Sequence, residues 1–278
     1  MKKIKAAIYV YIKSLTSIEY YRSVLSEPTL FSVKYFLVIS LIASLFITAY
    51  MSFQAVPVAT KAFDTFVEKI KEIYPADLEI SMNKDSWSIN KPEPYFIAFP
   101  KMETEEAKTF SNLVVFDHNG TLEDLEKHKT LVLVNAKNLL SKENQGIKVV
   151  PLKDLPQTTI TREMFDKGVN QLAELKKFLP FLIIAIIGIG MTFYYIVLRL
   201  IYLFFVAVAV WIIGKFTHLK PNFGTSYRIS IHTLTLPITI EFIVILLGIN
   251  IPFVFWFFAL NCIFATLVMT KIGASTAN

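Results

Sequence analysis

The sequence is poor in the residues that build disulfide-bonded folds and most transition-metal sites. Its 278 residues include one cysteine, Cys262, inside an apolar run, and four histidines, at positions 118, 128, 218 and 232. One cysteine excludes an intrachain disulfide and a cysteine-based metal site, and the histidines show no spacing typical of ligands. A glycine-rich phosphate-binding loop is also missing. We therefore expect no metal and no cofactor.

Charged residues are scarce, whereas long apolar runs are abundant. Hydrophobic residues make up 54% of the chain and charged residues 18%, and the mean hydropathy is +0.51. Soluble domains are rarely so apolar, so the composition predicts an integral membrane protein. The 24 phenylalanines and 12 tyrosines are typical of membrane spans and their interfaces.

Three apolar regions are long enough to cross a bilayer, which takes about 20 helical residues. The first, 35–56, follows a leader too long for a cleaved signal peptide, and we interpret it as an uncleaved anchor. The second, 178–214, has no central turn residue, which favours one long helix over two. The turn GINIP divides the third into two spans, 229–247 and 250–270. We expect about four transmembrane helices, or five if the second region is broken.

Basic residues are concentrated in two short segments. The N-terminal segment 1–34 has six basic and two acidic residues, and the loop 215–228 has three basic residues and no acidic one. The stretch 57–177 has 17 basic and 19 acidic residues. Because positively charged loops tend to remain in the cytoplasm, we predict a plasma-membrane protein with cytoplasmic termini and an extracytoplasmic 57–177. The tail 271–278 is then inside, and five spans are disfavoured because they would place the basic loop outside.

The formal net charge of +6 indicates lipid rather than nucleic acid as the partner of the basic segments. Such segments bind anionic lipid head groups at the inner membrane surface. Six apolar residues of the N-terminal segment recur near helical spacing, at Ile4, Ile8, Tyr11, Leu15, Ile18 and Leu25. They predict either an amphipathic helix on the membrane surface or a helix packed on the protein's own loops.

The stretch 57–177 is long enough for one small folded domain. It begins and ends with amphipathic helical patterns, at 58–75 and 161–178, which are expected to continue into the membrane. Between them, six pieces predict strands: LEISM, WSI, YFIAF, LVVFD, LVLV and IKVV. The expected fold is an α-helical integral membrane protein with an inserted α+β extracytoplasmic domain.

The stretch VVFDHNGTL, residues 114–122, resembles the first motif of haloacid-dehalogenase-type phosphatases, in which Asp-x-Asp-Gly-Thr follows a strand. Here Asn119 replaces the second aspartate and cannot act as a general acid, and no closely spaced aspartate pair follows to hold Mg²⁺. Asn119 and Gly120 both tolerate positive φ. We therefore interpret Asp117, Asn119 and Gly120 as a hairpin or loop turn, and expect no enzyme.

Three longer segments carry a second resemblance across nearly the whole chain: SLTSIEYYRSVLSEPTLFSVKYFLVISLI, NLVVFDHNG and NFGTSYRISIHTLTLPITIE. Together they resemble the bacterial multi-pass membrane family of unknown function DUF1189, some of whose members are labelled maltodextrin-utilisation proteins. The last segment is also similar to membrane domains of the Yip type. The resemblance implies a plasma-membrane protein with an accessory link to sugar uptake, and it brings no catalytic residues.

Two ionisable residues, Arg199 and Glu241, lie inside predicted spans, where charge is costly. On the four-span topology their depths differ by only ~4–5 Å, at about 1.5 Å per residue, so we predict that they pair. The pair can set the helix register or belong to a proton or ion relay, and a single pair favours the register. In the third span, Pro237 predicts a kink, where His232 and Thr233 line a substrate path or pack helices together.

These features favour a non-enzymatic accessory or scaffold protein with a membrane protein partner. The first alternative is an extracytoplasmic ligand sensor that transmits through its two membrane-linked helices, and the second is a small transporter. In a sensor, Trp87, Tyr95 and Phe96 are able to stack on a sugar, although their pattern favours a place in the core.

Overall fold

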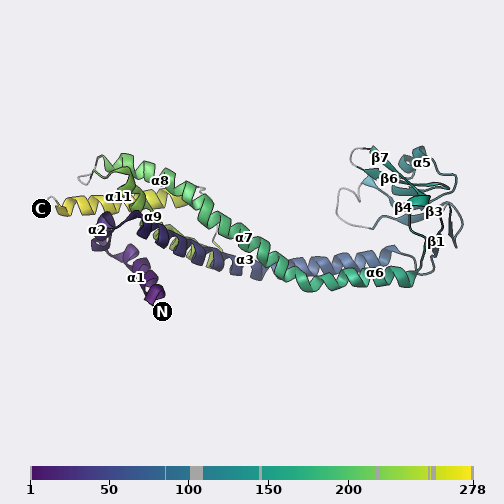
Figure 1. Ribbon diagram of the computed structural model, residues 1–278, viewed down its shortest axis with the longest axis horizontal. Helices are drawn as coiled ribbons and strands as arrows, with labels where there is room; N and C mark the ends of the chain where they lie inside the picture. Colours follow the sequence, from purple (N-terminus) through teal and green to yellow (C-terminus); the bar gives the residue numbers. More distant parts are fainter. Residues whose placement is uncertain are drawn as a thin grey trace. The chain divides into compact units, whose positions relative to one another are not determined.

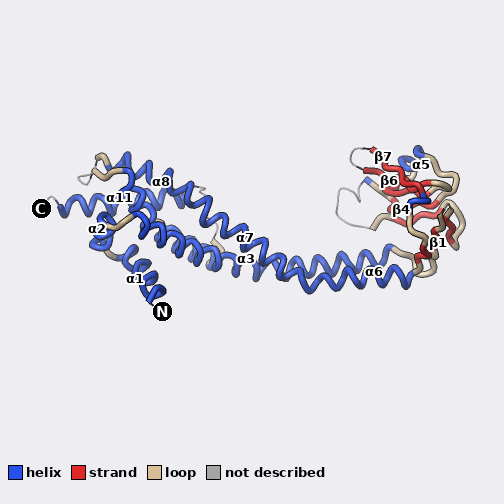
Figure 2. Tube along the Cα trace, in the orientation of Figure 1, coloured by secondary structure: helices blue, strands red, loops and turns tan. Residues whose placement is uncertain are grey.

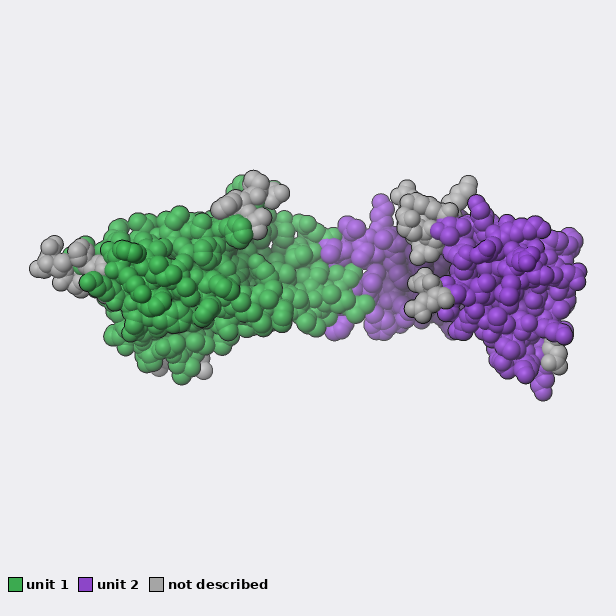
Figure 3. Space-filling model, turned by 90° about the horizontal axis from the view of Figure 1, so that it is seen from above, with its two compact units in different colours: residues 1–54, 182–278 green, residues 55–181 purple. Residues whose placement is uncertain are grey.

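The computed structural model describes residues 2–84, 86–100, 109–143, 146–216, 220–249, 251 and 255–276. These residues form two compact units, coloured separately in Figure 3. The helical unit consists of residues 1–54 and 182–278, and the sheet unit consists of residues 55–181. The strands all belong to the sheet unit (Figure 2).

The helical unit is built from the following elements, some of which continue into the sheet unit and most of which Figure 1 labels: α1 (Lys2–Thr16), α2 (Ile18–Ser26), α3 (Thr29–Ile73), α7 (Leu179–Phe193), a π-helical turn (Tyr194–Leu198), α8 (Arg199–Gly214), α9 (Phe223–Thr233), α10 (Thr235–Leu246) and α11 (Trp256–Thr276). Four helical stretches are long and apolar enough to cross a membrane: Thr29–Ile73, Arg162–Gly214, Phe223–Leu246 and Trp256–Ala274. The structure therefore confirms a mostly helical fold with four apolar helical stretches and a separate sheet-containing region.

The span boundaries depend on capping groups and turns. The third span begins at Phe223, inside the segment expected to be the basic loop, because Asn222 caps it by accepting from the Thr225 backbone N at 2.8 Å. The second apolar region is helical throughout, without a break at Arg199. Parts of three predicted segments lie outside the described residues: 217–219 of the loop, 250 and 252–254 around the GINIP turn, and 277–278 of the tail.

The two N-terminal helices pack against other helices of the unit rather than against loops. In α1, Tyr11 shares a hydrogen bond of 2.7 Å with Thr239 of α10. In α2, Tyr21 is buried in the core formed with α9 and α11. The apolar side chain of Ile8 nevertheless stays exposed on α1, and that of Ile4 lies outside the described residues. α2 is thus part of the folded core, while α1 keeps an apolar face uncovered.

The sheet unit contains two small sheets. A three-stranded sheet has the order β2-β1-β8, and a five-stranded sheet has the order β3-β4-β5-β6-β7. The strands are β1 (Ile80–Met82), β2 (Trp87–Ile89), β3 (Tyr95–Ala98), β4 (Asn112–Phe116), β5 (Thr130–Val134), β6 (Asn138–Glu143), β7 (Gly146–Pro151) and β8 (Thr158–Ile160). All paired strands are antiparallel except β4 and β5, which α5 (Leu122–Lys127) connects.

Two helical segments flank the strands of the sheet unit in the sequence, α3 before them and α6 after them. The end of α3 and the start of α6 (Arg162–Glu174) meet at Tyr74, whose backbone O accepts from Arg162 Nη1 at 2.6 Å. The Tyr74 ring stacks on Phe165 with ring centroids 4.9 Å apart. Lys176, in a short 3-10 helix (Leu175–Phe178) that follows α6, forms an ion pair with Asp64 of α3 at 2.7 Å. The sequence joining the sheets to the apolar stretches is therefore helical on both sides.

The core of the sheet unit contains Trp87, which is 2% exposed and donates from Nε1 to the Asn135 backbone O at 2.7 Å. Tyr95 packs against this core while partly buried. The prediction of a core position is wrong for Phe96, which is 41% exposed. Neighbouring strand residues point to opposite faces, and in β3 the buried position belongs to Ile97.

Candidate functional site

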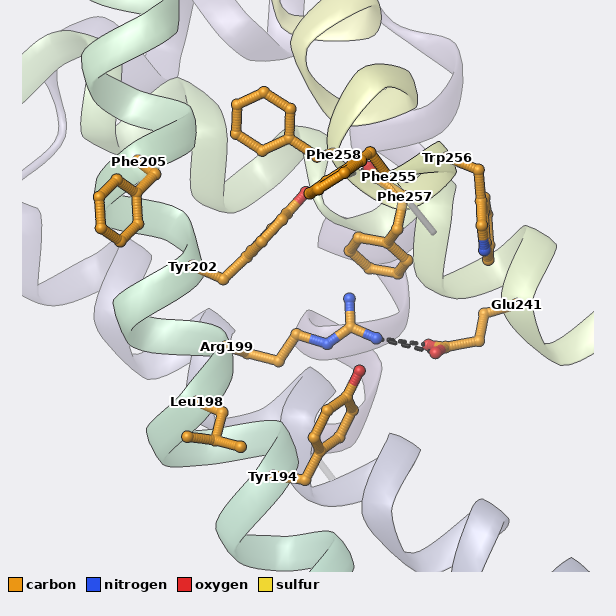
Figure 4. Close-up of a pocket in the computed structure, with 10 residues that line it drawn as sticks. All are labelled: Tyr194, Leu198, Arg199, Tyr202, Phe205, Glu241, Phe255, Trp256, Phe257 and Phe258. Atoms are coloured by element: carbon orange, nitrogen blue, oxygen red, sulfur yellow. Dashed lines mark hydrogen bonds and ion pairs between the residues drawn. The ribbon is translucent and has the colours of Figure 1, made fainter. Parts of the chain in front are cut away.

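Arg199 and Glu241 meet inside the helical unit. Arg199 begins α8 directly after the π-helical turn, and Glu241 lies in α10. Arg199 Nη2 donates to both carboxylate oxygens, at 2.8 and 3.0 Å (Figure 4). Tyr195 Oη donates to Glu241 Oε2 at 3.0 Å. The Arg199 and Glu241 side chains are 5% and 16% exposed, so the ion pair is largely buried. The sequence predicted this pair from the similar depths of the two residues in their spans.

Aromatic rings surround the guanidinium group. Its Cζ atom lies 3.5 Å from the ring centroid of Phe257, at the start of α11, and 5.1, 5.3 and 5.9 Å from those of Tyr194, Tyr195 and Tyr202. A desolvated cation over a ring gains about 2 kcal/mol. Two of the tyrosines belong to the π-helical turn, a local widening that often occurs at functional sites.

A cavity of about 590 Å³ opens beside this ion pair. Arg199, Glu241 and Leu198 line it together with seven aromatic residues: Tyr194, Tyr202, Phe205, Phe255, Trp256, Phe257 and Phe258 (Figure 4). The volume is within the range of small-molecule sites, about 300–1,000 Å³. The sequence marked Arg199 and Glu241 as unusual, but the aromatic wall was not predicted, because its residues come from α8, α11 and the segments preceding them.

His232, a candidate for a substrate path, is fully buried and has two polar partners. Its Nδ1 lies 2.9 Å from Tyr20 Oη, and its Nε2 lies 3.1 Å from Ser32 Oγ. Its ring stacks on Tyr35, with ring centroids 4.8 Å apart. These partners belong to α2 and α3, whereas His232 belongs to α9. The histidine therefore links three helices.

The predicted kink at Pro237 takes the form of a break between α9 and α10 at Leu234. A proline in the first turn of α10 cannot donate a hydrogen bond to the Thr233 carbonyl. Thr233 Oγ1 donates to Asn261 Oδ1 of α11 at 2.7 Å, and Thr235 Oγ1 lies 2.6 Å from Tyr35 Oη. These hydroxyls are engaged between helices, which favours the packing interpretation over a substrate path.

The turn at Asp117, Asn119 and Gly120 joins a strand to a helix and is not a hairpin. The Asp117 carbonyl accepts from Gly120 N at 3.0 Å, and its Oδ1 accepts from Asn119 N at 3.0 Å. The described glycines with positive φ are Gly146 and Gly248. A positive φ therefore does not explain the glycine at position 120, and that part of the prediction is wrong. A Cβ atom there would lie 2.8 Å from Leu133 Cδ2. Close packing against β5 therefore favours glycine.

The residues after this turn cap α5. Thr121 donates to Asp124 Oδ2 from its backbone N at 3.0 Å and from its hydroxyl at 2.9 Å. These two hydrogen bonds, the backbone one first, keep the pKa of Asp124 below its usual value. Among the described residues, no group of three or more histidine, cysteine, aspartate or glutamate side chains could hold a metal ion. His218 lies outside the described residues.

β7 presents a free edge of the five-stranded sheet. Val149 of β7 lies opposite Leu140 of β6, and Leu152 N donates to Lys137 O at 2.9 Å. Together these pairings show which residues of β7 form hydrogen bonds with β6. In an antiparallel ladder, every second residue directs its N–H and C=O away from the partner strand. In β7 those residues are Ile147 and Val149, whose side chains are 40% and 50% exposed. Within the described part of the chain, β6 is the single strand that pairs with β7.

Comparison with known proteins gives one match. The model of the family DUF1189, protein of unknown function, matches residues 10–269. No curated protein and no solved structure matches the chain. The matched range includes all three segments on which the resemblance was based, so that prediction is confirmed. The chain therefore belongs to the DUF1189 family.

Proposed function

We propose that this protein is a non-enzymatic, multi-pass plasma-membrane accessory or scaffold protein, which presents its sheet unit outside the cell to a partner membrane protein. The observation that supports this best is the β7 edge. Proteins usually protect sheet edges with charge, proline, bulges or a covering segment. β7 has two such features, Lys148 and Pro151, but the residues that direct their N–H groups outward, Ile147 and Val149, are apolar and exposed. An extended partner segment adds to such an edge through main-chain hydrogen bonds.

The orientation in this proposal rests on charge. The segment 1–34 and the loop 215–228 carry the excess of basic residues. In the sequence, one apolar helical stretch connects each of them to the sheet unit, Thr29–Ile73 and Arg162–Gly214, so the preference of basic segments for the cytoplasm supports a cytoplasmic position for both. These basic segments contact anionic lipid head groups. The partner is a membrane complex, and the maltodextrin label in the family points to an oligosaccharide uptake system as the first complex to examine.

Replacing Val149 with proline is expected to reduce recovery of the partner about tenfold or more. Proline removes the outward N–H of Val149 that a partner strand needs, while the β6–β7 ladder keeps its own hydrogen bonds. The full-length protein would be purified from its native membrane in a gentle detergent, and the stoichiometric copurifying protein quantified by mass spectrometry.

The matched control is Val149→Thr, which keeps the N–H and the β-branched shape and should retain the partner. Thermal unfolding of both variants would show whether the sheet unit is intact. Equal partner recovery from the folded Val149→Pro protein would contradict strand addition at β7. Purification without any stoichiometric partner would remove the main support for a scaffold.

The proposed orientation predicts which side of the membrane each segment faces. In a Cys262→Ser background, Lys148→Cys places a thiol on the exposed surface of the sheet unit, and Lys5→Cys places one on exposed α1. A membrane-impermeant maleimide should label the first variant in intact cells and the second only after permeabilisation. Labelling in the reverse order would overturn the orientation.

A second candidate function is an extracytoplasmic ligand sensor. It is favoured by the two uninterrupted helical stretches, Thr29–Ile73 and Arg162–Gly214, which run from the sheet unit into the helical unit. A continuous helix transmits a displacement better than a flexible linker does. Saturable binding of maltotriose by the full-length protein, accompanied by changed proteolysis of the helical unit, would favour the sensor over the scaffold.

A further inference from the structure

The cavity beside Arg199 has more hydrogen-bond donors than acceptors. Both Glu241 oxygens are occupied, because they accept two hydrogen bonds from Arg199 Nη2 and one from Tyr195 Oη. Arg199 Nε is buried and has no hydrogen-bond partner among the described residues. An unsatisfied buried donor on a charged group is costly. Arg199 also lines the cavity, so a molecule that fills the cavity is best matched to this cationic donor if it supplies an acceptor oxygen.

The charge of the site favours an uncharged molecule. Arg199 and Glu241 already neutralise each other at 2.8 Å, and both are largely buried. An anion in the cavity would add a third charge to a poorly solvated space, where it would also compete with Glu241 for the guanidinium group. A neutral carbonyl oxygen accepts from the guanidinium group without changing the net charge.

The walls of the cavity favour an apolar, membrane-soluble molecule. Seven aromatic side chains line it, and they surround a single pair of opposite charges (Figure 4). Aromatic walls around a few convergent polar groups are typical of small-molecule sites. The cavity lies within the helical unit, to which all four apolar stretches contribute, and this setting favours a ligand that dissolves in the bilayer.

We propose that this cavity binds an uncharged, membrane-soluble molecule through a carbonyl oxygen that accepts a hydrogen bond from Arg199. This function is separate from partner binding at β7. Two kinds of membrane molecule have this chemistry: glycerolipids, through an ester carbonyl, and quinones, through a ring carbonyl. Tyr194 and Phe257 face the guanidinium group, and so either an acyl ester or a flat ring would lie against an aromatic surface.

The test uses delipidated full-length protein in detergent and native mass spectrometry. Three probes are titrated separately: dioctanoylglycerol, a short-chain naphthoquinone, and a short-chain phosphatidylglycerol as the anionic comparison. We expect one saturable adduct per chain with at least one neutral probe and weaker binding of the anionic lipid. The neutral probe that binds identifies the source of the carbonyl, and binding of both shows that the carbonyl alone is recognised.

Variants separate this cavity from general lipid binding. Leu198→Trp adds bulk to the cavity lining while keeping both residues of the ion pair, and we expect it to weaken the adduct about tenfold or more. The control Leu200→Trp changes a leucine of α8, two residues farther along the chain, that does not line the cavity, and it should bind like the unmodified protein. The charge-free double variant Arg199→Met/Glu241→Gln should lose the adduct, because it lacks the guanidinium donor.

The proposal would be overturned by three results. The first is the failure of both neutral probes to form a saturable adduct. The second is an adduct of equal affinity in the folded Leu198→Trp protein. The third is tighter binding of phosphatidylglycerol than of either neutral probe. Partner recovery through β7 is measured independently, so either proposal can fail while the other stands.

Discussion

Replacing Glu241 with glutamine is expected to destabilise the helical unit by about 3–5 kcal/mol, because it leaves Arg199 as a buried charge without its counter-ion. The carboxylate accepts two hydrogen bonds from Arg199 Nη2 and one from Tyr195. A neutral amide cannot balance the guanidinium charge. Rings of Phe257 and three tyrosines hold the guanidinium in place, so Arg199 cannot easily turn toward water.

Thermal unfolding of the full-length protein in detergent would measure this loss. The double variant Arg199→Met/Glu241→Gln should recover most of the stability, since it removes both charges together. The control Glu174→Gln changes an exposed glutamate of α6 and should stay within about 0.5 kcal/mol of the unmodified protein. A fully stable and assembled Glu241→Gln protein that has lost activity would instead support a proton or ion relay.

Replacing Trp87 with alanine should destabilise the sheet unit by about 3–5 kcal/mol, the usual cost of removing a buried tryptophan. The indole is 2% exposed and packs against Phe116 and His118, with ring centroids at 5.3 and 4.1 Å. Its loss would also leave the Asn135 carbonyl without the donor that now lies 2.7 Å away. The change therefore combines a cavity with an unsatisfied polar group.

Hydrogen–deuterium exchange of the full-length protein would follow this effect strand by strand. Trp87→Ala should accelerate exchange in β2, β4 and β5, and Trp87→Phe should do so less. The control Phe96→Ala removes a 41% exposed ring from β3 and should change exchange little. Unchanged exchange in Trp87→Ala would mean that the core does not need the indole. The alternative role of Trp87, stacking on a sugar in a ligand sensor, would then be favoured again.

The apolar helical stretches were predictable because membrane-spanning helices need a long local pattern. A span requires about 20 successive apolar residues, whatever the helix packs against. Arg199 and Glu241 were recognisable for the same reason, because a charge in such a run is rare. The start of the third span was missed, since it depends on a single cap at Asn222.

Three short elements of the sheet unit were not predicted. β6, with the sequence NLLSKE, has little apolar alternation and is held by its pairing with β5 and β7. β8 has three residues and pairs with β1. α5 has six residues, LEDLEK, and connects the parallel strands β4 and β5. In each case pairing or packing with other elements supports the conformation, because so short a segment has a weak preference of its own.

The sequence by itself determined the mostly helical fold, the four apolar stretches long enough to cross a membrane, the presence of a sheet-containing region and the family. These properties follow from local composition and hydrophobic runs. The tertiary structure alone decided that Phe257 and three tyrosines surround Arg199. It also decided that, among the residues the structure describes, Arg199 Nε has no hydrogen-bond partner and β7 is an edge strand. Such features depend on contacts between segments far apart in the chain, which local patterns do not encode.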